Sequence, residues 1–243
     1  MPVSETTTDA RTIVVVPTLD EAENIESLAR ELLALPAAVD LLVVDDSSRD
    51  GTADRVRALG AETQRVHLLE RPRRMGLGTA YRDGFRWALE RGYRRLVQMD
   101  ADHSHPPSDV PRLLEALDRA EIAVGTRYLP GSRIVGWPRR RWLLSRGAAL
   151  YVAPILGLRV SDPMGGFKAY RAEALERMGL AAFQATGYLF QAESLYRASR
   201  AGCTMEEVPI TFRERAAGVS KMTGGIIWEA ALGPWRIRFG AKP

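Results

Sequence analysis

Cysteine is almost absent from this chain of 243 residues, which contains Cys203 alone. A single cysteine excludes an intramolecular disulfide and a metal site built from several cysteines. Such sparse use of cysteine is typical of a reducing compartment. We therefore expect a cytoplasmic protein.

Long hydrophobic runs are also missing. The longest apolar stretch, residues 147–158, is far shorter than the ~20 residues that a helix needs to cross a bilayer. Residues 1–11 lack the apolar core of a secretory signal peptide and predict a polar, mobile tail. With 46% hydrophobic and 26% charged residues, the composition is that of a globular protein. We expect a soluble mixed fold with no transmembrane helix.

Acidic residues are absent from one segment, residues 122–161. The whole chain has 34 basic and 30 acidic residues and a formal charge of +4. Without the seven arginines of this segment, 27 basic residues would face 30 acidic ones, so this segment alone makes the protein basic. Its arginines are Arg127, Arg133, Arg139, Arg140, Arg141, Arg146 and Arg159. A local positive charge of this size suits an anionic partner.

Two hydrophobic periodicities alternate through the first half of the chain. Short runs of β-branched and aliphatic residues predict buried strands at residues 12–16, 41–44, 66–69, 94–99 and 122–125. Helical patterns predict helices between or after them at residues 21–35, 52–59, 79–90 and 108–119. This alternation indicates an α/β fold with a doubly wound, Rossmann-like, mostly parallel sheet. Ligands of such sheets bind at the carboxyl ends of the strands.

The alternation ends after Tyr128. A loop rich in glycine, proline and arginine leads to an amphipathic helix at residues 142–158 and to the loop SDPMGGF. The remaining pattern predicts helices at 172–178 and 189–201, a strand-like segment at 203–212 and a last helix at 226–239. Because no linker separates these elements, we expect one domain with a C-terminal helical subregion.

Acidic residues lie in the segments that follow three of the predicted strands. These segments are Pro17-Thr18-Leu19-Asp20-Glu21 after the first, Asp45-Asp46 after the second and Asp100-Ala101-Asp102 after the fourth. Like charges gathered at one edge of a sheet repel one another unless a cation or hydrogen-bond donors compensate them. Asp20 and Asp50, which precede predicted helices, are better explained as helix caps.

The sequence Asp100-Ala101-Asp102 is the sharpest of these signals. In an extended segment, residues i and i+2 project to the same side, where both carboxylates can bind one divalent cation. Carboxylate oxygens select Mg²⁺ or Mn²⁺, which usually keep positions for water and for substrate phosphates. The sequence therefore predicts a Mg²⁺ or Mn²⁺ site that receives a diphosphate.

His103 and His105 follow this motif at once. A zinc hydrolase that uses them together with Asp100 and Asp102 is therefore an alternative. The favoured explanation of HSHPP is a turn with two polar histidines, in which the prolines start the next helix.

The glycines of RRMGLGTAY, residues 73–81, resemble part of a dinucleotide-binding fingerprint. The third glycine is missing and the motif does not follow the first strand, so we do not expect a hydride-transfer enzyme. The sequence instead predicts a glycine turn beside a nucleotide pocket, with Arg73 and Arg74 solvated or facing phosphate.

Together these residues resemble the inverting GT-A glycosyltransferases of family two, and within them the polyprenol (dolichol) phosphate mannose synthases. The motifs that carry the resemblance are VVVPTLDEAENI, LLVVDDSSRDGT, MGLGTAYRDGF, QMDADHSHPP, GTRYLPGSRIVGW, SDPMGGFKAYR and VPITFRERAAGVSK. The resemblance implies a GT-A catalytic domain over residues 12–221 after the tail of residues 1–11. Within it, residues 12–126 would form the donor half and 127–221 the acceptor, membrane-facing half, before an amphipathic segment at 222–243.

The resemblance also implies roles for individual residues. The positions that would bind the donor are Pro17, Leu19, Glu21, Val44, Asp46, Asp100, Ala101, Asp102, Arg127, Arg215 and Lys221. Those that would bind the acceptor phosphate are Arg127, Arg141 and Ser145, and those that would bind the metal are Asp100, Asp102 and Ser104. Asp102 and Arg127 would be the catalytic residues.

Three positions depart from the pattern of the family. Leu19 stands where an aromatic residue is usual, so stacking on the base would be weaker or come from elsewhere. Ser104 replaces a frequent glutamine, so water would complete the metal shell. Met164-Gly165 replaces a common Thr-Ser pair and so offers no side-chain hydroxyl.

The implied reaction is the inverting transfer of mannose from GDP-mannose to a polyprenyl (dolichyl-type) monophosphate. A phosphate monoester, with a second pKa of about 6, is already largely dianionic at neutral pH and needs no protein base. Within the same class, a UDP-glucose-dependent polyprenyl phosphate glucosyltransferase is the alternative.

The arginine-rich segment also predicts a membrane contact. Its apolar residues between 142 and 156 lie beside Arg139–Arg141, and residues 226–239 form a second amphipathic candidate. We expect a peripheral protein on the cytoplasmic face of a membrane, with a membrane-anchoring subunit as a further partner to test. A non-enzymatic nucleic-acid or membrane binder is the alternative of another class. No recognised nucleic-acid motif accompanies the arginines, so we expect no nucleic-acid partner.

Overall fold

The computed structural model describes residues 11–214 and 224–240, with side-chain environments up to residue 214 and again from residue 231. Its main sheet has the strand order β3-β2-β1-β4-β7-β5-β8. These strands are β1 (Thr12–Thr18), β2 (Val39–Asp45), β3 (Val66–Glu70), β4 (Arg95–Gln98), β5 (Ile122–Thr126), β7 (Lys168–Arg171) and β8 (Met205–Pro209). All neighbours run parallel except β7, which is antiparallel to β4 and β5. The mostly parallel α/β sheet expected from the sequence is confirmed.

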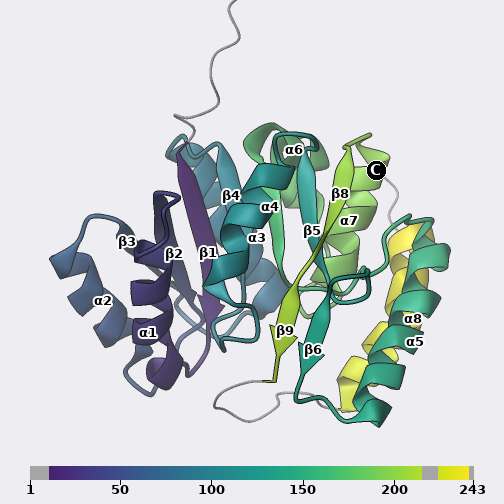
Figure 1. Ribbon diagram of the computed structural model, residues 1–243, viewed down its shortest axis with the longest axis horizontal. Coiled ribbons are helices and arrows are strands. Elements are labelled where there is room, and N and C mark those ends of the chain that lie inside the picture. The colour runs from purple at the N-terminus through teal and green to yellow at the C-terminus, as the bar shows by residue number, and fades with distance from the viewer. Residues whose placement is uncertain (1–10, 215–223, 241–243) are drawn as a thin grey trace, which may run out of the picture.

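Helices cover both faces of this sheet (Figure 1). One face is covered by α1 (Ala22–Leu33), α2 (Thr52–Glu62) and α4 (Val110–Ala116). The other is covered by α3 (Leu77–Glu90), α6 (Ala172–Met178) and α7 (Phe190–Arg200). These six helices were predicted, although a short 3₁₀ turn at Pro107–Asp109 precedes α4. The two prolines of HSHPP therefore lie at the start of the helical region, as predicted.

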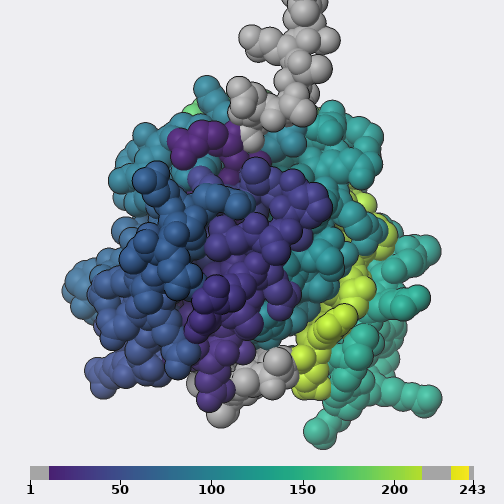
Figure 2. Space-filling model, turned by 60° about the vertical axis from the view of Figure 1, so that its left-hand side comes forward, coloured from purple at the N-terminus to yellow at the C-terminus, as the bar shows by residue number. Residues whose placement is uncertain are grey.

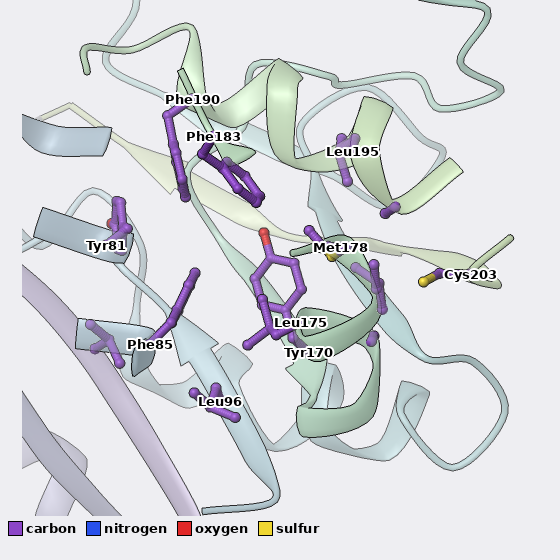
Figure 3. Close-up of a cluster of buried hydrophobic side chains, with 14 of the residues drawn as sticks. Tyr81, Phe85, Leu96, Tyr170, Leu175, Met178, Phe183, Phe190, Leu195 and Cys203 are labelled. Atoms are coloured by element: carbon purple, nitrogen blue, oxygen red, sulfur yellow. The ribbon is translucent and has the colours of Figure 1, made fainter. Parts of the chain in front are cut away.

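Two separate hydrophobic cores follow from the alternation of side chains along the central strands. On β1, Ile13 and Val15 face α3, α6 and α7, whereas Val14 and Val16 face α1, α2 and α4. All four are fully buried, as expected for a parallel strand covered on both sides. Figure 3 shows part of the first core, where aromatic rings of α3, β7 and α7 meet.

Two strands of the structure were not predicted. β7 was missed because it has only four residues, KAYR, and its buried face begins with a lysine. β6 (Arg133–Val135) lies within the loop predicted after Tyr128 and pairs in parallel with β9 (Thr211–Arg213). β6 and β7 have only three and four residues, so their hydrophobic pattern is too short to recognise.

α5 (Arg139–Leu156) and α8 (Gly224–Gly240) lie side by side at one end of the sheet (Figure 1). α5 starts three residues earlier than predicted. The Tyr151 hydroxyl donates to the carbonyl oxygen of Ala231 (2.8 Å) and accepts from Nε1 of Trp235 (2.9 Å). Within the described ranges, no helix combines the length and the hydropathy needed to cross a bilayer.

The carboxyl ends of the parallel strands point to one end of the molecule, toward the β6–β9 pair (Figure 1). β5 reaches this edge at Thr126, the last residue of the predicted donor half. Figure 2 shows the N-terminal part of the chain, in purple and blue, gathered on one side, with the teal middle part of the chain on the other. Elements from both halves thus meet at the carboxyl edge, where the sequence places its candidate site.

Replacing glycine by alanine should change the stability of the protein in opposite directions at Gly84 in α3 and at Gly147 in α5. The reason is that α3 packs closely against the sheet at Gly84, whereas Gly147 has open space beside it. A Cβ on Gly84 would lie 2.6 Å from Cγ1 of Val15 and 2.9 Å from Cγ2 of Val44. We therefore expect Gly84→Ala to lower the free energy of unfolding by about 1–3 kcal/mol through overpacking. Gly147→Ala in α5, whose added Cβ meets no heavy atom within 4 Å, should raise it by about 0.5–1 kcal/mol. Denaturant unfolding of both variants checks this, and a shift of the same sign in both would contradict it.

Candidate active site

The loop after β4 carries Asp100 and Asp102. β4 ends at Gln98 and residues 101–105 form bends, so the alternation of an extended strand does not align these two carboxylates. Asp100 keeps 35% of its side chain exposed, and its Oδ1 accepts a hydrogen bond from the Tyr81 hydroxyl (3.1 Å). Asp102 is buried, and its Oδ1 accepts from the backbone N–H of Ser104 (3.1 Å). Asp100 is thus the more exposed of the two carboxylates.

A turn with two glycines lies against Asp100. A Cβ on Gly166 would stand 3.0 Å from Oδ2 of Asp100, so a side chain there would crowd the carboxylate. Lys168 holds this turn from the interior, because its Nζ donates to the carbonyl oxygen of Gly165 (2.6 Å) and to Oε1 of Gln191 (2.7 Å). Burial lowers the pKa of Lys168 to about 7. A fully buried lysine therefore supports the floor of the site through its hydrogen bonds.

A buried ion pair fixes Arg127 at the end of β5. Its Nε and Nη2 donate to the two carboxylate oxygens of Asp162 at 2.7 and 2.8 Å, and its backbone N–H also donates to Oδ2 (3.2 Å). The Asp162 side chain is completely buried and that of Arg127 is 10% exposed. Burial opposes the charge of Arg127, but Asp162 outweighs it and the pKa of the guanidinium is raised. Arg127 is therefore charged, rigid and already paired.

Aromatic rings enclose the Arg127 guanidinium. Its Cζ lies 5.4 Å from the ring centroid of Tyr128, 5.5 Å from Trp137 and 5.3 Å from Phe212. The rings come from three segments of the second half of the chain. They shield the ion pair from water and strengthen it.

α5 carries the two other residues predicted at the acceptor phosphate. The Arg141 guanidinium lies 4.4 Å over the Trp137 ring, and Oγ of Ser145 accepts a hydrogen bond from the Tyr128 hydroxyl (2.6 Å). Because Trp137 and Tyr128 both lie beside Arg127, the structure brings Arg127, Arg141 and Ser145 to one region.

The predicted contacts to the base and ribose lie at the ends of β1 and β2. Pro17 and Val44 are buried within these strands, and Leu19 and Glu21 follow β1 at partly buried positions. Oε2 of Glu21 accepts from the side chain of Asn24 (2.8 Å). These residues lie close to one another at the ends of two adjacent strands, and their contact with a donor stays a prediction.

Asp46 organises the glycine turn before α3. Its Oδ1 accepts from Nη1 of Arg71 and from the backbone N–H of Met75 (both 2.8 Å), and its Oδ2 accepts from the N–H of Gly76 (2.9 Å). Arg71 and Asp46 form a second buried ion pair. Arg73 and Arg74, in the same turn, are exposed to solvent, which is one of the two environments predicted for them.

Asp50 and Asp20 differ in their structural roles. Asp50 accepts from the backbone N–H of Ala22 (2.8 Å) and of Thr52 (3.0 Å), so it caps the starts of α1 and α2 together. Asp20 instead accepts from the N–H of Arg49 (2.8 Å) and ties two loops together. The capping prediction is confirmed for Asp50 and wrong for Asp20.

The two histidines also differ. His103 adopts a left-handed turn conformation (φ 57°), and its Nε2 lies 2.9 Å from the hydroxyl of Ser27. His105 is buried against Phe167, so the prediction of two polar turn histidines holds for His103 only. In the described ranges, no three histidine, cysteine or acidic side chains are placed to hold a metal ion, which leaves the zinc hydrolase without support.

The remaining predicted residues fall into two groups. Ala101 and Ser104 are buried in the loop after β4, and the Ser104 carbonyl oxygen accepts from the N–H of Arg213 (3.0 Å), which ties the loop to β9. Arg215 and Lys221 lie outside the described residues, as does the predicted tail up to residue 10.

Sequence reasoning missed Asp162, Lys168 and Tyr81 as parts of the site. Asp162 is the first acidic residue after residues 122–161, a segment that contains seven arginines and no acidic residue. A buried arginine in that segment needs a carboxylate partner, so the place of Asp162 in the sequence could have indicated the ion pair. Lys168 and Tyr81 gave no such signal, because their position depends on the pairing of β7 and on the packing of α3.

The family of the chain follows from comparison with known sequences. The profile described as glycosyl transferase family 2 matches residues 13–179, which is more than half of the chain. The chain belongs to glycosyl transferase family 2. It is therefore a member of an enzyme family, and the match covers the loop of Asp100 and the ion pair of Arg127 and Asp162.

Named relatives match nearly the whole chain. Undecaprenyl-phosphate mannosyltransferase from Micrococcus luteus is 45% identical over 233 residues, which cover 96% of each protein. Polyprenol monophosphomannose synthase from Mycolicibacterium smegmatis is 45% identical over 232 residues, which cover 94% of this chain and 88% of that protein. The resemblance to this branch of the family, stated from the motifs, is confirmed.

Solved structures support the fold. Glucosyl-3-phosphoglycerate synthase from Mycobacterium tuberculosis, in complex with Mn²⁺, UDP and glucosyl-3-phosphoglycerate, matches with a TM-score of 0.69 at 20% identity. The match covers 100% of this chain and 88% of that chain. The GT-A fold expected from the sequence is confirmed.

The residues of this family 2 site fit a hard divalent cation shared with a ligand. The loop after β4 offers carboxylate oxygens, which Mg²⁺ and Mn²⁺ prefer. Oδ1 of Asp100 is oriented by Tyr81, and about a third of the Asp100 side chain stays open to solvent. Mg²⁺ is commonly held by one or two carboxylates plus water and phosphate oxygens. Two aspartates in one loop therefore suit a cation that arrives with a diphosphate.

Loss of the buried carboxylate should destabilise the protein strongly. Asp162→Asn keeps the shape of the side chain but leaves a buried guanidinium without its counter-charge, so we expect a loss of about 3–5 kcal/mol in the free energy of unfolding. The control is Glu206→Gln, which breaks the surface pair with Arg119, where the side chains are 32% and 56% exposed. That change should cost at most about 1 kcal/mol. Denaturant unfolding compares the two, and equal losses would refute the structural role of Asp162.

Proposed function

We propose that the chain transfers mannose from GDP-mannose to a polyprenyl monophosphate, with inversion at the anomeric carbon. The observation that carries this proposal is the 45% identity, over more than nine tenths of the chain, with two proteins named for mannose transfer to polyprenyl phosphates. GDP-mannose as the donor comes from the resemblance of the motifs to that branch. The geometry of the carboxyl edge is consistent with such a donor.

The acceptor needs no activating base in this reaction. A phosphate monoester is largely dianionic at neutral pH because its second pKa is about 6. The barrier instead comes from bringing this dianion toward the anionic diphosphate of the donor and from the charge that grows on the departing GDP. Fixed positive groups at both ends lower that barrier.

At the acceptor end, Arg127 and Arg141 would receive the lipid phosphate. Arg141 pairs with Glu214 (2.6 Å) at a site where both side chains are more than a third exposed, so phosphate can replace this partner at little cost. The guanidinium of Arg127 has five N–H donors, of which two bind the carboxylate of Asp162. Arg127 would thus keep its ion pair while it contacts phosphate, and Ser145 would add a hydroxyl.

At the donor end, Asp100 and Asp102 would hold Mg²⁺ or Mn²⁺, with Ser104 nearby in the same loop. When bound, such a cation offsets the negative charge that develops on the leaving diphosphate. Pro17, Leu19, Glu21, Val44 and Asp46 would surround the base and ribose, and Ala101 would line the sugar. Arg215 and Lys221 would add positive charge at the diphosphate.

The helices α5 and α8 would bring the protein to the lipid that holds the acceptor. Large apolar side chains of both helices are exposed: Trp142, Leu143, Leu144, Leu150, Tyr151, Leu232, Trp235 and Phe239. Arg139 and Arg140 are exposed at the start of α5. Apolar and basic side chains in this arrangement suit the interface of an anionic membrane. We place the enzyme as a peripheral protein on the cytoplasmic membrane face, where a membrane-anchoring subunit would be a further partner.

Radiolabel transfer from GDP-mannose into a polyprenyl monophosphate, recovered in organic solvent, tests the reaction. We expect transfer by the wild type, loss of at least about 100-fold in Asp102→Ala because the metal and diphosphate lose a ligand, and no loss in Asp54→Ala. Asp54 is the control because its side chain is 82% exposed on α2. UDP-glucose is assayed in parallel. Transfer of glucose but not mannose would refute the donor, and full activity of Asp102→Ala would refute the site.

Flotation with vesicles that contain anionic lipid tests the membrane contact. Leu144→Glu replaces a leucine that is 75% exposed on α5 and should reduce vesicle binding several-fold, because it removes apolar contact and adds a repelled charge. Ala181→Glu adds the same charge at an exposed position of another segment and should bind like the wild type. Equal binding of all three proteins at low salt would contradict the membrane contact.

A further inference from the structure

His105 lies deep in the protein beside the candidate donor site. Only 2% of the residue is exposed. Its ring stacks on Phe167 with the centroids 5.0 Å apart and meets Phe212 edge-on at 5.3 Å. Phe167 directly follows the Gly165–Gly166 turn, and Phe212 belongs to β9. Neighbours from two elements of the site therefore fix the plane of the imidazole.

The Nδ1 atom of this ring is shielded from solvent and has no hydrogen-bond partner among the described residues. Buried polar atoms are nearly always hydrogen bonded in native proteins, so an exception calls for an explanation. A carboxylate oxygen, Oδ2 of Asp100, lies 3.9 Å from this nitrogen. If His105 served only to pack against its neighbours, an aromatic ring without a nitrogen at this position would be sufficient.

The distance between these two atoms is about 1 Å longer than an N–H···O hydrogen bond. Oδ1 of Asp100 is already held by the Tyr81 hydroxyl at 3.1 Å, and a Cβ on Gly166 would stand 3.0 Å from Oδ2. The absence of that Cβ leaves the Oδ2 side of the carboxylate room to move. A small rotation of the carboxylate about its contact with Tyr81 would bring Oδ2 into range of Nδ1. Hydrogen bonds of active sites commonly tighten in this way when ligands bind.

We propose that His105 is a positioning residue whose Nδ1–H donates to Oδ2 of Asp100 and, with Tyr81 on Oδ1, directs this carboxylate toward the divalent cation and diphosphate of the donor. The proposal rests on the donor site described under the proposed function. Carboxylates that bind metals are commonly oriented by a second hydrogen-bond partner, and loss of that partner typically weakens metal binding 10–100-fold. His105 is not a catalytic residue in this assignment, because it touches neither substrate nor metal.

The test measures Mn²⁺ binding in the presence of GDP by the electron paramagnetic resonance signal of free Mn²⁺. His105→Phe keeps an aromatic ring for both stacking contacts but has no N–H, and we expect it to weaken Mn²⁺ binding about 10–100-fold. His105→Asn places an amide nitrogen close to the position of Nδ1 and should restore binding to within about threefold of the wild type. Wild-type affinity in His105→Phe, or equal loss in both variants, would overturn the proposal.

A second measurement uses the wild-type protein, so its result does not depend on whether a variant folds. In protein with ¹⁵N-labelled histidine and no metal, long-range ¹H–¹⁵N spectra report which ring nitrogen carries the proton. We expect the Nδ1–H form for His105, since only that form can donate to Asp100. A spectrum with the proton on Nε2 and none on Nδ1 would overturn the proposal.

The outcomes separate this proposal from the proposed function, because neither measurement uses mannose or a lipid acceptor. If mannose transfer fails while Mn²⁺ and nucleotide still bind, the proposed reaction is refuted and the result for His105 stands. If the wild type binds Mn²⁺ with neither GDP nor UDP, the donor site and the role of His105 are both refuted.

Discussion

The bidentate ion pair between Arg127 and Asp162 joins the end of β5 to the loop that leads into β7. Both side chains are buried, so displacing either one would leave a charge without a partner in a medium of low dielectric constant. The pair therefore fixes the path of the SDPMGGF loop across the sheet edge. The Gly165–Gly166 turn, the support from Lys168 and the position of Asp100 above the turn all depend on that path.

A second buried pair, Arg71 with Asp46, fixes the glycine turn on the donor side of the same edge. Each pair locks a loop that borders the candidate site, and each neutralises its own arginine. The carboxylate of Asp100 stays partly open to solvent at this edge. An edge of this kind suits a divalent cation that brings a diphosphate with it, which agrees with membership of glycosyl transferase family 2.

The seven arginines between residues 122 and 161 do not form one uniform basic surface. Arg127 is buried in its ion pair, and Arg146 donates to the carbonyl oxygen of Ser161 (3.1 Å) beside the same region. Arg139 and Arg140 stay exposed at the start of α5, next to its exposed leucines. One segment thus provides a structural charge, candidate phosphate contacts and a basic rim for the apolar face of α5 and α8.

Much of the architecture was predictable because its signals are local. The apolar runs of β1 and β2, the helical patterns of α1 and α3 and the carboxylates after three of the strands predicted the sheet and the edge that carries the site. The motifs predicted the family. The antiparallel strand β7 was not predictable, because four residues with a buried lysine show no strand pattern.

The sequence by itself therefore determined the fold class, the family and the residues at the carboxyl edge, since these depend on periodicity and on short motifs. Only the tertiary structure decided which of those residues serve the fold. It assigned Asp46 to a structural ion pair, Asp20 to a contact between two loops, and His105 to a buried position beside Asp100. The physical reason is that a partner for a buried charge or polar atom comes from a distant segment, and its distance and burial exist only after the chain has folded.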